Sequence, residues 1–201
     1  MHTYSYLALG DSYTVGEAVS LQSSFPCQTI KLLRKNDFPF MPPEIIAETG
    51  WTTMDLERAI KDHPFLPKYD FVSLLIGVNN QYRGSDVIEY KEQLEELVKR
   101  AIELGNGKKD HVVLFSIPDY GFTPFAKSMD RDKISKEIDV FNSVSKANSI
   151  QYKLHYIEIT TGSRMGKDDP NMVARDGLHP APKEYAKWAR KLSELIALQL
   201  K

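Results

Sequence analysis

The amino-acid sequence predicts an α/β fold in which a parallel sheet lies between two layers of helices. Short apolar runs of strand length alternate along the chain with longer segments whose apolar residues recur every three or four positions. Two of the runs, 71–76 and 112–117, are almost continuously apolar, which is typical of parallel strands buried on both faces. Strands that alternate with helices form βαβ units, and these units place helices on both faces of the sheet.

The predicted elements follow one another in a simple order, five strands that are each followed by a helix. The strands are expected at 4–9, 44–47, 71–76, 112–117 and 154–159. The clearest helical stripe comprises Val87, Tyr90, Leu94, Leu97, Val98 and Ala101. Because the chain contains no internal repeat, low-complexity tract or interdomain linker, residues 1–201 are interpreted as a single domain.

The composition excludes several classes of protein. Lys and Arg number 26 against 27 Asp and Glu, so the net charge is -1. This balance argues against bulk electrostatic binding to nucleic acid or to an anionic membrane. A single cysteine, Cys27, excludes an intrachain disulfide and a metal site built from several cysteines.

The apolar runs also bear on membranes and location. None of them approaches the roughly 20 residues of a membrane-spanning helix, so no membrane span is expected. The first residues lack the basic start and the long apolar stretch of a signal peptide, and the chain as given is therefore expected to be cytoplasmic. An exported protein whose signal peptide had been removed would begin in the same way, so export stays open.

Chemically capable residues follow the predicted strands. In open α/β sheets, ligands bind beyond the carboxyl ends of the strands. The segments at these ends are Gly10-Asp11-Ser12-Tyr13, Glu48-Thr49-Gly50-Trp51, Gly77-Val78-Asn79-Asn80, Pro118-Asp119-Tyr120-Gly121 and, after a loop, Asp176-Gly177-Leu178-His179-Pro180. We therefore expect a serine, glycines, an amide pair and an Asp/His pair to meet at one edge of the sheet.

These residue types suit acyl transfer. Ser12 needs a base to become a nucleophile, and His179 is the natural base near neutral pH. Asp176, three residues before His179, is close enough to orient the imidazole across a tight turn. The oxyanion formed by attack needs preorganised donors, and the candidates are the N–H groups of Ser12 and Gly50 and the side-chain amide of Asn79.

The same blocks resemble those of the SGNH hydrolases, also called GDSL-type esterases and lipases. The resemblance extends from residue 7 to residue 182 and rests on four blocks in the right order. It implies a flavodoxin-like sandwich with a five-stranded parallel sheet, and hydrolysis of esters without a metal or organic cofactor. It also implies that Ser12 is the nucleophile, His179 the base and Asp176 its partner, with Ser12, Gly50 and Asn79 in the oxyanion hole.

Two positions depart from the family pattern. The usual leucine after the serine is Tyr13 here, which is expected to alter the pocket wall. The usual aspartate after Asn79 is Asn80, which puts a structural hydrogen bond in doubt rather than the chemistry. Asp11, the carboxylate beside Ser12, is interpreted as a side chain that stabilises the turn by accepting backbone N–H bonds.

The substrate is predicted less sharply than the reaction. The residues flanking the blocks are the candidate substrate contacts, namely Tyr13, Trp51, Gln81, Tyr82, Arg83 and Tyr120. Their mixture of aromatic and polar groups favours a small-molecule or carbohydrate ester, for example a short-chain or O-acetyl ester. The polar segment 160–175 is long enough to be a binding loop and is expected to shape one wall of the pocket.

Two alternatives stay open at this point. A lysophospholipase or thioesterase would have the same fold and the same chemical residues. A non-catalytic, flavodoxin-like module would bind flavin or nucleotide and would need a phosphate-binding loop after the first strand. Gly10-Asp11-Ser12-Tyr13-Thr14 fits such a loop poorly, because the Asp11 carboxylate would repel phosphate.

Overall fold

The five strands lie in one parallel sheet, as the sequence predicts. The computed structural model describes residues 2–165 and 169–201. The strand order is β2-β1-β3-β4-β5, and each neighbouring pair is parallel. The strands are β1 (Tyr6–Asp11), β2 (Glu44–Glu48), β3 (Phe71–Leu75), β4 (Val112–Phe115) and β5 (His155–Ile157).

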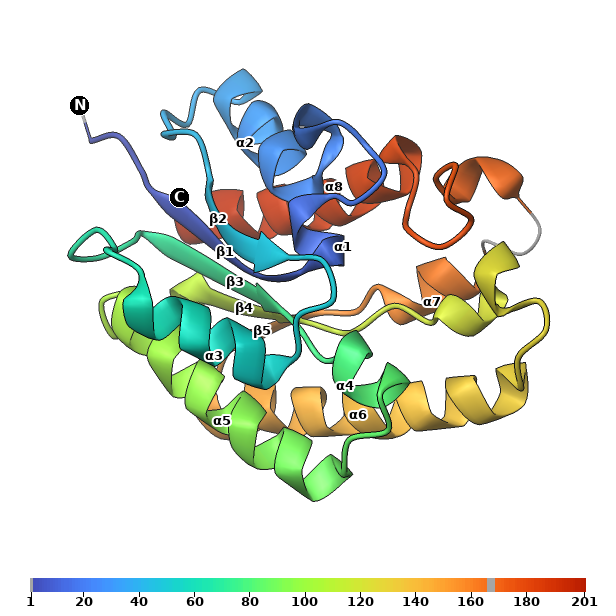
Figure 1. Ribbon diagram of the computed structural model, residues 1–201. Helices are drawn as coiled ribbons and strands as arrows, with labels where there is room; N and C mark the ends of the chain where they lie inside the picture. The colour runs from blue at the N-terminus through green and yellow to red at the C-terminus, as the bar shows by residue number, and fades with distance from the viewer. Residues whose placement is uncertain (1, 166–168) are drawn as a thin grey trace.

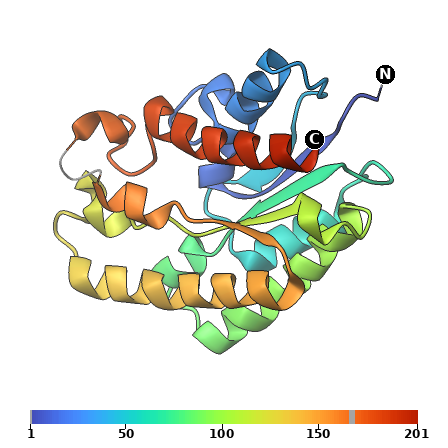
Figure 2. The ribbon, with the colours of Figure 1, turned by 180° about the vertical axis from the view of Figure 1, so that it is seen from behind.

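Helices cover both faces of this sheet (Figures 1 and 2). One face carries α2 (Phe25–Lys35) and α8 (Pro182–Gln199), and the other carries α3 (Thr53–Asp62), α5 (Val87–Leu104) and α6 (Arg131–Tyr152). Three shorter helices follow strands directly, namely α1 (Ser12–Val15), α4 (Val78–Tyr82) and α7 (Thr160–Arg164). The three-layer α/β/α prediction is thus confirmed.

The burial of the strands explains their sequence patterns. Every residue of β1, β3 and β4 is buried, because helices cover both faces of these central strands. The edge strands β2 and β5 are mostly half-buried. Aromatic packing joins the layers: the Phe25 ring lies 5.1 Å from that of Phe115 in β4 and 6.2 Å from that of Trp188 in α8.

The strands end at other residues than predicted, because hydrogen-bond pairing with the neighbouring strand sets where each strand ends. β1 runs on to Asp11, because its last residues pair with the end of β2 (Asp11 with Glu48). β4 stops at Phe115, since the Ile117 N–H donates to the Asn142 side chain instead of to a neighbouring strand. β5 is shorter than the predicted 154–159, because its last residue, Ile157, pairs with Phe115, where β4 ends.

Local signals fix the helix starts near the carboxyl edge of the sheet. Thr52 and Asp55 form a reciprocal capping box at the start of α3. Asp86 caps α5 by accepting the N–H groups of Ile88 and Glu89. In Figure 1, α7 lies in the right half of the molecule and both chain termini lie at the left, with α4 between them.

Candidate active site

One pocket at the carboxyl edge of the sheet brings together most of the predicted site residues. Its volume is about 160 Å³. The residues that line it come from α1, the loop after β2, α4, the loop after β4 and the loop before α8. They are Ser12, Tyr13, Thr49, Gly50, Val78, Asn79, Tyr82, Tyr120, Phe125, Leu178 and His179.

Ser12 is the first residue of α1, immediately after β1. The turn is tight at Gly10, where a Cβ atom would lie 2.1 Å from Thr14 Oγ1 and 2.4 Å from the Leu75 carbonyl oxygen. Only glycine fits so close an approach. The sharp strand-to-helix turn sets Ser12 at the floor of the pocket, where it is almost completely buried.

Asp11 stabilises this turn, as interpreted from the sequence. Its Oδ1 accepts the Tyr13 N–H at 3.0 Å, and its Oδ2 has no hydrogen-bond partner among the described residues. Complete burial of this carboxyl group raises its pKa to about 7, although the bond from Tyr13 opposes the shift. Asp11 is therefore a buried acid whose charged form is disfavoured, directly behind Ser12.

Asp176 and His179 are joined as the sequence predicts. Asp176 Oδ2 lies 2.5 Å from His179 Nδ1, and its Oδ1 accepts the backbone N–H groups of Leu178 and His179 at 3.0 Å each. Partial burial opposes ionisation of Asp176, but the hydrogen bonds from the His179 ring and from the two N–H groups outweigh it and lower the pKa. The ionised carboxylate holds the His179 ring in one orientation, and a ring so held presents its other nitrogen for proton transfer.

The Tyr13 ring packs beside His179. The two ring centroids are 5.2 Å apart, and the Tyr13 ring also lies 6.4 Å from that of Trp188 in α8. Tyr13 is almost fully buried and lines the pocket. The aromatic residue in place of the family's usual leucine therefore forms part of the pocket wall, as expected.

Gly50 and Asn79 lie on the wall that carries backbone and amide donors. Gly50 has φ +86°, a left-handed conformation that glycine adopts without a steric cost. The Asn79 side chain donates one N–H to the Trp51 carbonyl oxygen at 2.9 Å. Its amide carries a second N–H, which is the one available for a substrate oxygen.

Asn80, which replaces the aspartate usual in the family pattern, forms two hydrogen bonds with Thr53. Asn80 Oδ1 accepts the Thr53 N–H at 3.0 Å, and its Nδ2 donates to Thr53 Oγ1 at 2.7 Å. The Thr53 hydroxyl in turn donates to Gln93. An ionised aspartate could accept the first bond but could not donate the second, so Asn80 matches the hydroxyl that faces it.

The structure divides the six candidate substrate contacts into two groups. Tyr13, Tyr82 and Tyr120 line the pocket. The other three do not line it. The Gln81 side chain donates to Glu137 at 2.8 Å, the Trp51 backbone carbonyl accepts from Asn79, and the Arg83 guanidinium donates to the Gly50 carbonyl at 2.6 Å.

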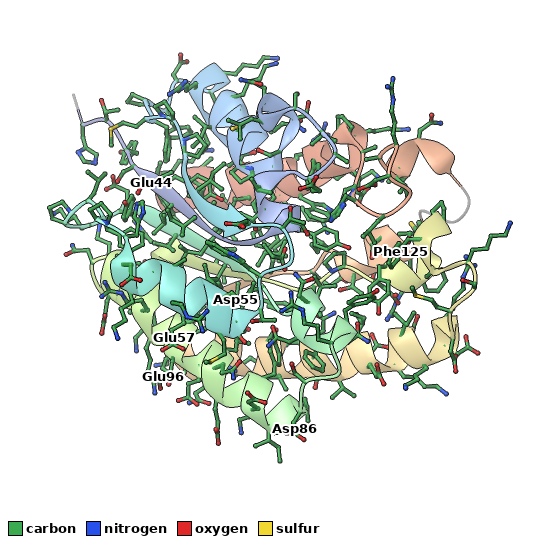
Figure 3. The ribbon with its side chains drawn as sticks, in the orientation of Figure 1. Glu44, Asp55, Glu57, Asp86, Glu96 and Phe125 are labelled. Carbon is green, nitrogen blue, oxygen red and sulfur yellow. The ribbon has the colours of Figure 1, made fainter. Side chains whose placement is uncertain are left out.

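Phe125 completes an aromatic wall that sequence reasoning missed. Its ring lies 6.1 Å from that of Tyr82 and 6.3 Å from that of Tyr120, and it lies in the loop after β4 near α7 (Figure 3). The Phe125 N–H donates to the Gly177 carbonyl at 2.9 Å, which ties this loop to the Asp176–His179 turn. No spacing signal marks Phe125, whereas the other missed lining residues, Thr49, Val78 and Leu178, lie inside the predicted blocks.

The segment 160–175 was expected to shape one wall of the pocket, but it supports the pocket indirectly. None of its described residues lines the main pocket. Instead α7 supports the loop after β4: Ser163 Oγ accepts the Asp119 N–H at 2.8 Å, and Arg164 Nε donates to Asp119 Oδ2 at 2.9 Å. The segment therefore acts on the pocket through Asp119 and its neighbour Tyr120, and residues 166–168 lie outside the described part.

Metal-site and membrane searches give negative results for the described residues. Among 2–165 and 169–201, no group of three or more His, Cys, Asp or Glu side chains is arranged to hold a metal ion. In the same part of the chain, no helix is both long enough and apolar enough to cross a membrane.

Comparisons with solved structures identify the fold. Axe2, an acetylxylan esterase from Geobacillus stearothermophilus, superimposes with a TM-score of 0.75 at 19% identity, over 96% of this chain and 94% of that one. TesA gives 0.69 at 19% identity, over 98% of both chains. The psychrotrophic esterase EstA from Pseudoalteromonas sp., in a structure inhibited by monoethylphosphonate, gives 0.69 at 16% identity, also over 98% of both.

Sequence comparison identifies the family. A search of curated proteins finds no match to the chain. Residues 8–187, in contrast, match the GDSL-like lipase/acylhydrolase family, so the match spans most of the chain and includes every block described above. This finding favours the hydrolase interpretation over a non-catalytic flavin or nucleotide module. The chain therefore belongs to the GDSL-like lipase/acylhydrolase family and is a carboxylic ester hydrolase.

Proposed function

We propose that this protein is a serine esterase that hydrolyses short-chain esters, including O-acetyl esters of carbohydrates, through an acyl-enzyme. The observation that carries the proposal is a single pocket lined by Ser12, Gly50, Asn79 and His179, with Asp176 bonded to the His179 ring. This set supplies a nucleophile, a base held by a carboxylate, and donors for an oxyanion.

In the proposed reaction, Ser12 Oγ attacks the ester carbonyl while His179 Nε2 takes the hydroxyl proton. The Ser12 and Gly50 N–H groups and the Asn79 amide stabilise the oxyanion that forms. As the tetrahedral intermediate collapses, His179 protonates the leaving alcohol and an acyl-serine remains. Water, deprotonated by His179, then attacks the acyl-serine and releases the carboxylic acid and the free Ser12 hydroxyl. Asp176 stabilises the imidazolium in both half-reactions.

The size of the pocket supports a short acyl group. Its volume of about 160 Å³ is below the roughly 300 Å³ at which pockets for drug-sized ligands begin. Val78, Leu178 and Phe125 give it apolar surface that suits a small alkyl group. The described residues that line the pocket include no Lys or Arg, so the lining does not favour an anionic substrate. The net charge of -1 agrees with this.

The test of the proposed chemistry is Ser12→Ala. We expect this variant to lose hydrolysis of 4-nitrophenyl acetate and of acetylated xylo-oligosaccharides, because the nucleophile is absent. Circular dichroism and thermal unfolding are expected to match the wild type, since the hydroxyl is removed without a change of backbone. Hydrolysis at the wild-type rate by Ser12→Ala would refute the mechanism.

A chain-length series separates short-chain esters from the lipid-related alternative. We expect kcat/KM for 4-nitrophenyl esters to be highest at acetate or butanoate and to fall for longer acyl groups. A lysophospholipase or thioesterase would have its optimum at long acyl chains, and the apolar lining is the observation that favours it. Such an optimum, or release of fatty acid from lysophospholipid in preference to acetate from acetylated sugars, would contradict the short-chain proposal.

A further inference from the structure

The peptide between Thr49 and Gly50, which carries the Gly50 N–H, is flanked by two hydrogen bonds to charged side chains. The Thr49 hydroxyl donates to Glu17, the residue that follows Gly16 at the end of α1. On the other side, the Gly50 carbonyl oxygen accepts a hydrogen bond of 2.6 Å from Arg83 Nη2. These side chains add to the turn's own backbone bond, in which the Trp51 N–H donates to the Glu48 carbonyl at 3.3 Å.

Arg83 and Asn79 act on this loop together. They are four positions apart at α4, so their side chains lie on the same side of the helix. Arg83 donates to the Gly50 carbonyl, and Asn79 donates to the next carbonyl, that of Trp51, at 2.9 Å. Two consecutive carbonyl groups of the loop are thus fixed by one turn of α4.

Gly50 has open space on the side where a side chain would project. A Cβ atom built at Gly50 would have a single heavy atom of another residue within 4 Å outside its chain neighbours, namely Arg83 Nη2 at 3.5 Å. Glycine also has the widest choice of backbone conformations, and Gly50 has φ +86°. On this open side the Arg83 hydrogen bond restrains Gly50, in addition to the backbone bond of the turn.

The guanidinium has a second partner that keeps it in place. Arg83 Nη1 lies 3.7 Å from Asp55 Oδ2, in the capping box at the start of α3, where Figure 3 places Asp55. The planar guanidinium carries several donors in fixed directions, so it can contact the carboxylate and the Gly50 carbonyl at once. A lysine has no such fork.

We propose that Arg83 is a positioning residue that aims the Gly50 N–H at the oxyanion. This inference rests on the proposed function, because it presumes that Gly50 donates to the substrate oxygen. Arg83 itself does not line the pocket, so it acts through the backbone of Gly50. A donor that is correctly placed only for the developing charge stabilises the transition state more than the bound substrate. Loss of Arg83 is therefore expected to lower kcat and to leave KM nearly unchanged.

The test compares Arg83→Met with a matched control, Arg58→Ala. Arg58 also pairs with Asp55, at the same 3.7 Å, but on the other carboxylate oxygen and without a bond to Gly50. Both arginines are largely exposed, so neither change removes buried packing. With 4-nitrophenyl acetate we expect Arg83→Met to lower kcat roughly tenfold, with KM within about twofold of the wild type. For Arg58→Ala we expect kcat and KM equal to those of the wild type.

Three results would overturn the inference. One is an unchanged kcat in Arg83→Met. Another is an equal loss in both variants, which would assign the effect to Asp55 and the start of α3. The third is a change confined to KM, which would make Arg83 a substrate contact. Ser12→Ala, measured in the same assay, separates failure of the proposed function from failure of the Arg83 inference. Activity in Ser12→Ala refutes the proposed function. An inactive Ser12→Ala together with an unchanged Arg83→Met refutes only the role of Arg83.

Discussion

The two sides of the pocket are built from different kinds of contact. We call loop 49–53 with the polar side chains of α4 the donor side, and the rings of Tyr82, Tyr120 and Phe125 the aromatic side. Directional hydrogen bonds that involve the side chains of Asn79, Asn80 and Arg83 fix the donor side. The aromatic side has ring contacts with centroids 5.9–6.3 Å apart, and Tyr82 and Phe125 are more than a third exposed.

The difference suits the donor side to stabilising charge and the aromatic side to contacting the acyl group. Donors that stabilise a developing charge act best when they are fixed before the reaction, which hydrogen bonds in defined directions achieve. Ring contacts fix shape less tightly and are suited to contact with an apolar group. We therefore expect changes on the donor side to alter kcat, and changes on the aromatic side to alter which acyl group is preferred.

Among the changes that distinguish the two sides, the largest effect is expected from removal of the Asn79 amide. Asn79→Ala deletes the proposed donor to the oxyanion and the bond to the Trp51 carbonyl. We expect kcat to fall on the order of 10²-fold, while the order of preference among acyl groups stays as in the wild type. Steady-state kinetics with the ester series measures both quantities. A variant that keeps its kcat but changes its acyl preference would reverse the assignment of the two sides.

A smaller effect is expected on the aromatic side. Phe125→Ala enlarges the pocket, so the ratio of kcat/KM for hexanoate to that for acetate is expected to rise roughly tenfold. Met129→Ala is the matched control, because Met129 is a partly exposed apolar residue nearby in the chain that does not line the pocket. An unchanged ratio in Phe125→Ala, or an equal rise in the control, would remove Phe125 from the acyl site.

The last expected effect concerns stability rather than turnover, at the buried Asp11 behind Ser12. Burial raises the Asp11 pKa from 3.8 to about 7, so its contribution to stability is full below about pH 4 and is lost as pH rises through 7. Asp11→Asn keeps an oxygen for the Tyr13 N–H and does not titrate. Relative to the wild type, we expect the free energy of unfolding of this variant to increase from about pH 5 to about pH 8. Urea unfolding across this range measures the difference, and a constant difference would contradict the raised pKa.

Much of the site could be predicted because its chemistry is local in sequence. Asp176 and His179 are three residues apart, and Ser12 directly follows β1, so residue type and strand order sufficed. The fold was predictable for a similar reason, since central strands buried on both faces leave continuous apolar runs. The single-domain interpretation of 1–201 and the catalytic roles of the site residues stay predictions.

The features that the sequence did not predict depend on contacts between segments far apart in the chain. Phe125 joins the pocket through Tyr82 and through the Gly177 carbonyl, neither of which has a fixed spacing from it. Arg83 was expected to touch substrate because of its place beside Asn79, but its guanidinium bonds to the Gly50 carbonyl 33 positions earlier. The length of β5 was likewise set by pairing, since it ends opposite Phe115, the last residue of β4.

The central claim is that Ser12 carries the acyl group during turnover. The most direct measurement is mass spectrometry of the protein after reaction with an organophosphonate ester, which forms a stable adduct with an activated serine. We predict one adduct per chain, located on Ser12 by fragmentation of the peptide and absent from Ser12→Ala. An adduct on another residue, or none in a protein that still hydrolyses 4-nitrophenyl acetate, would contradict the account.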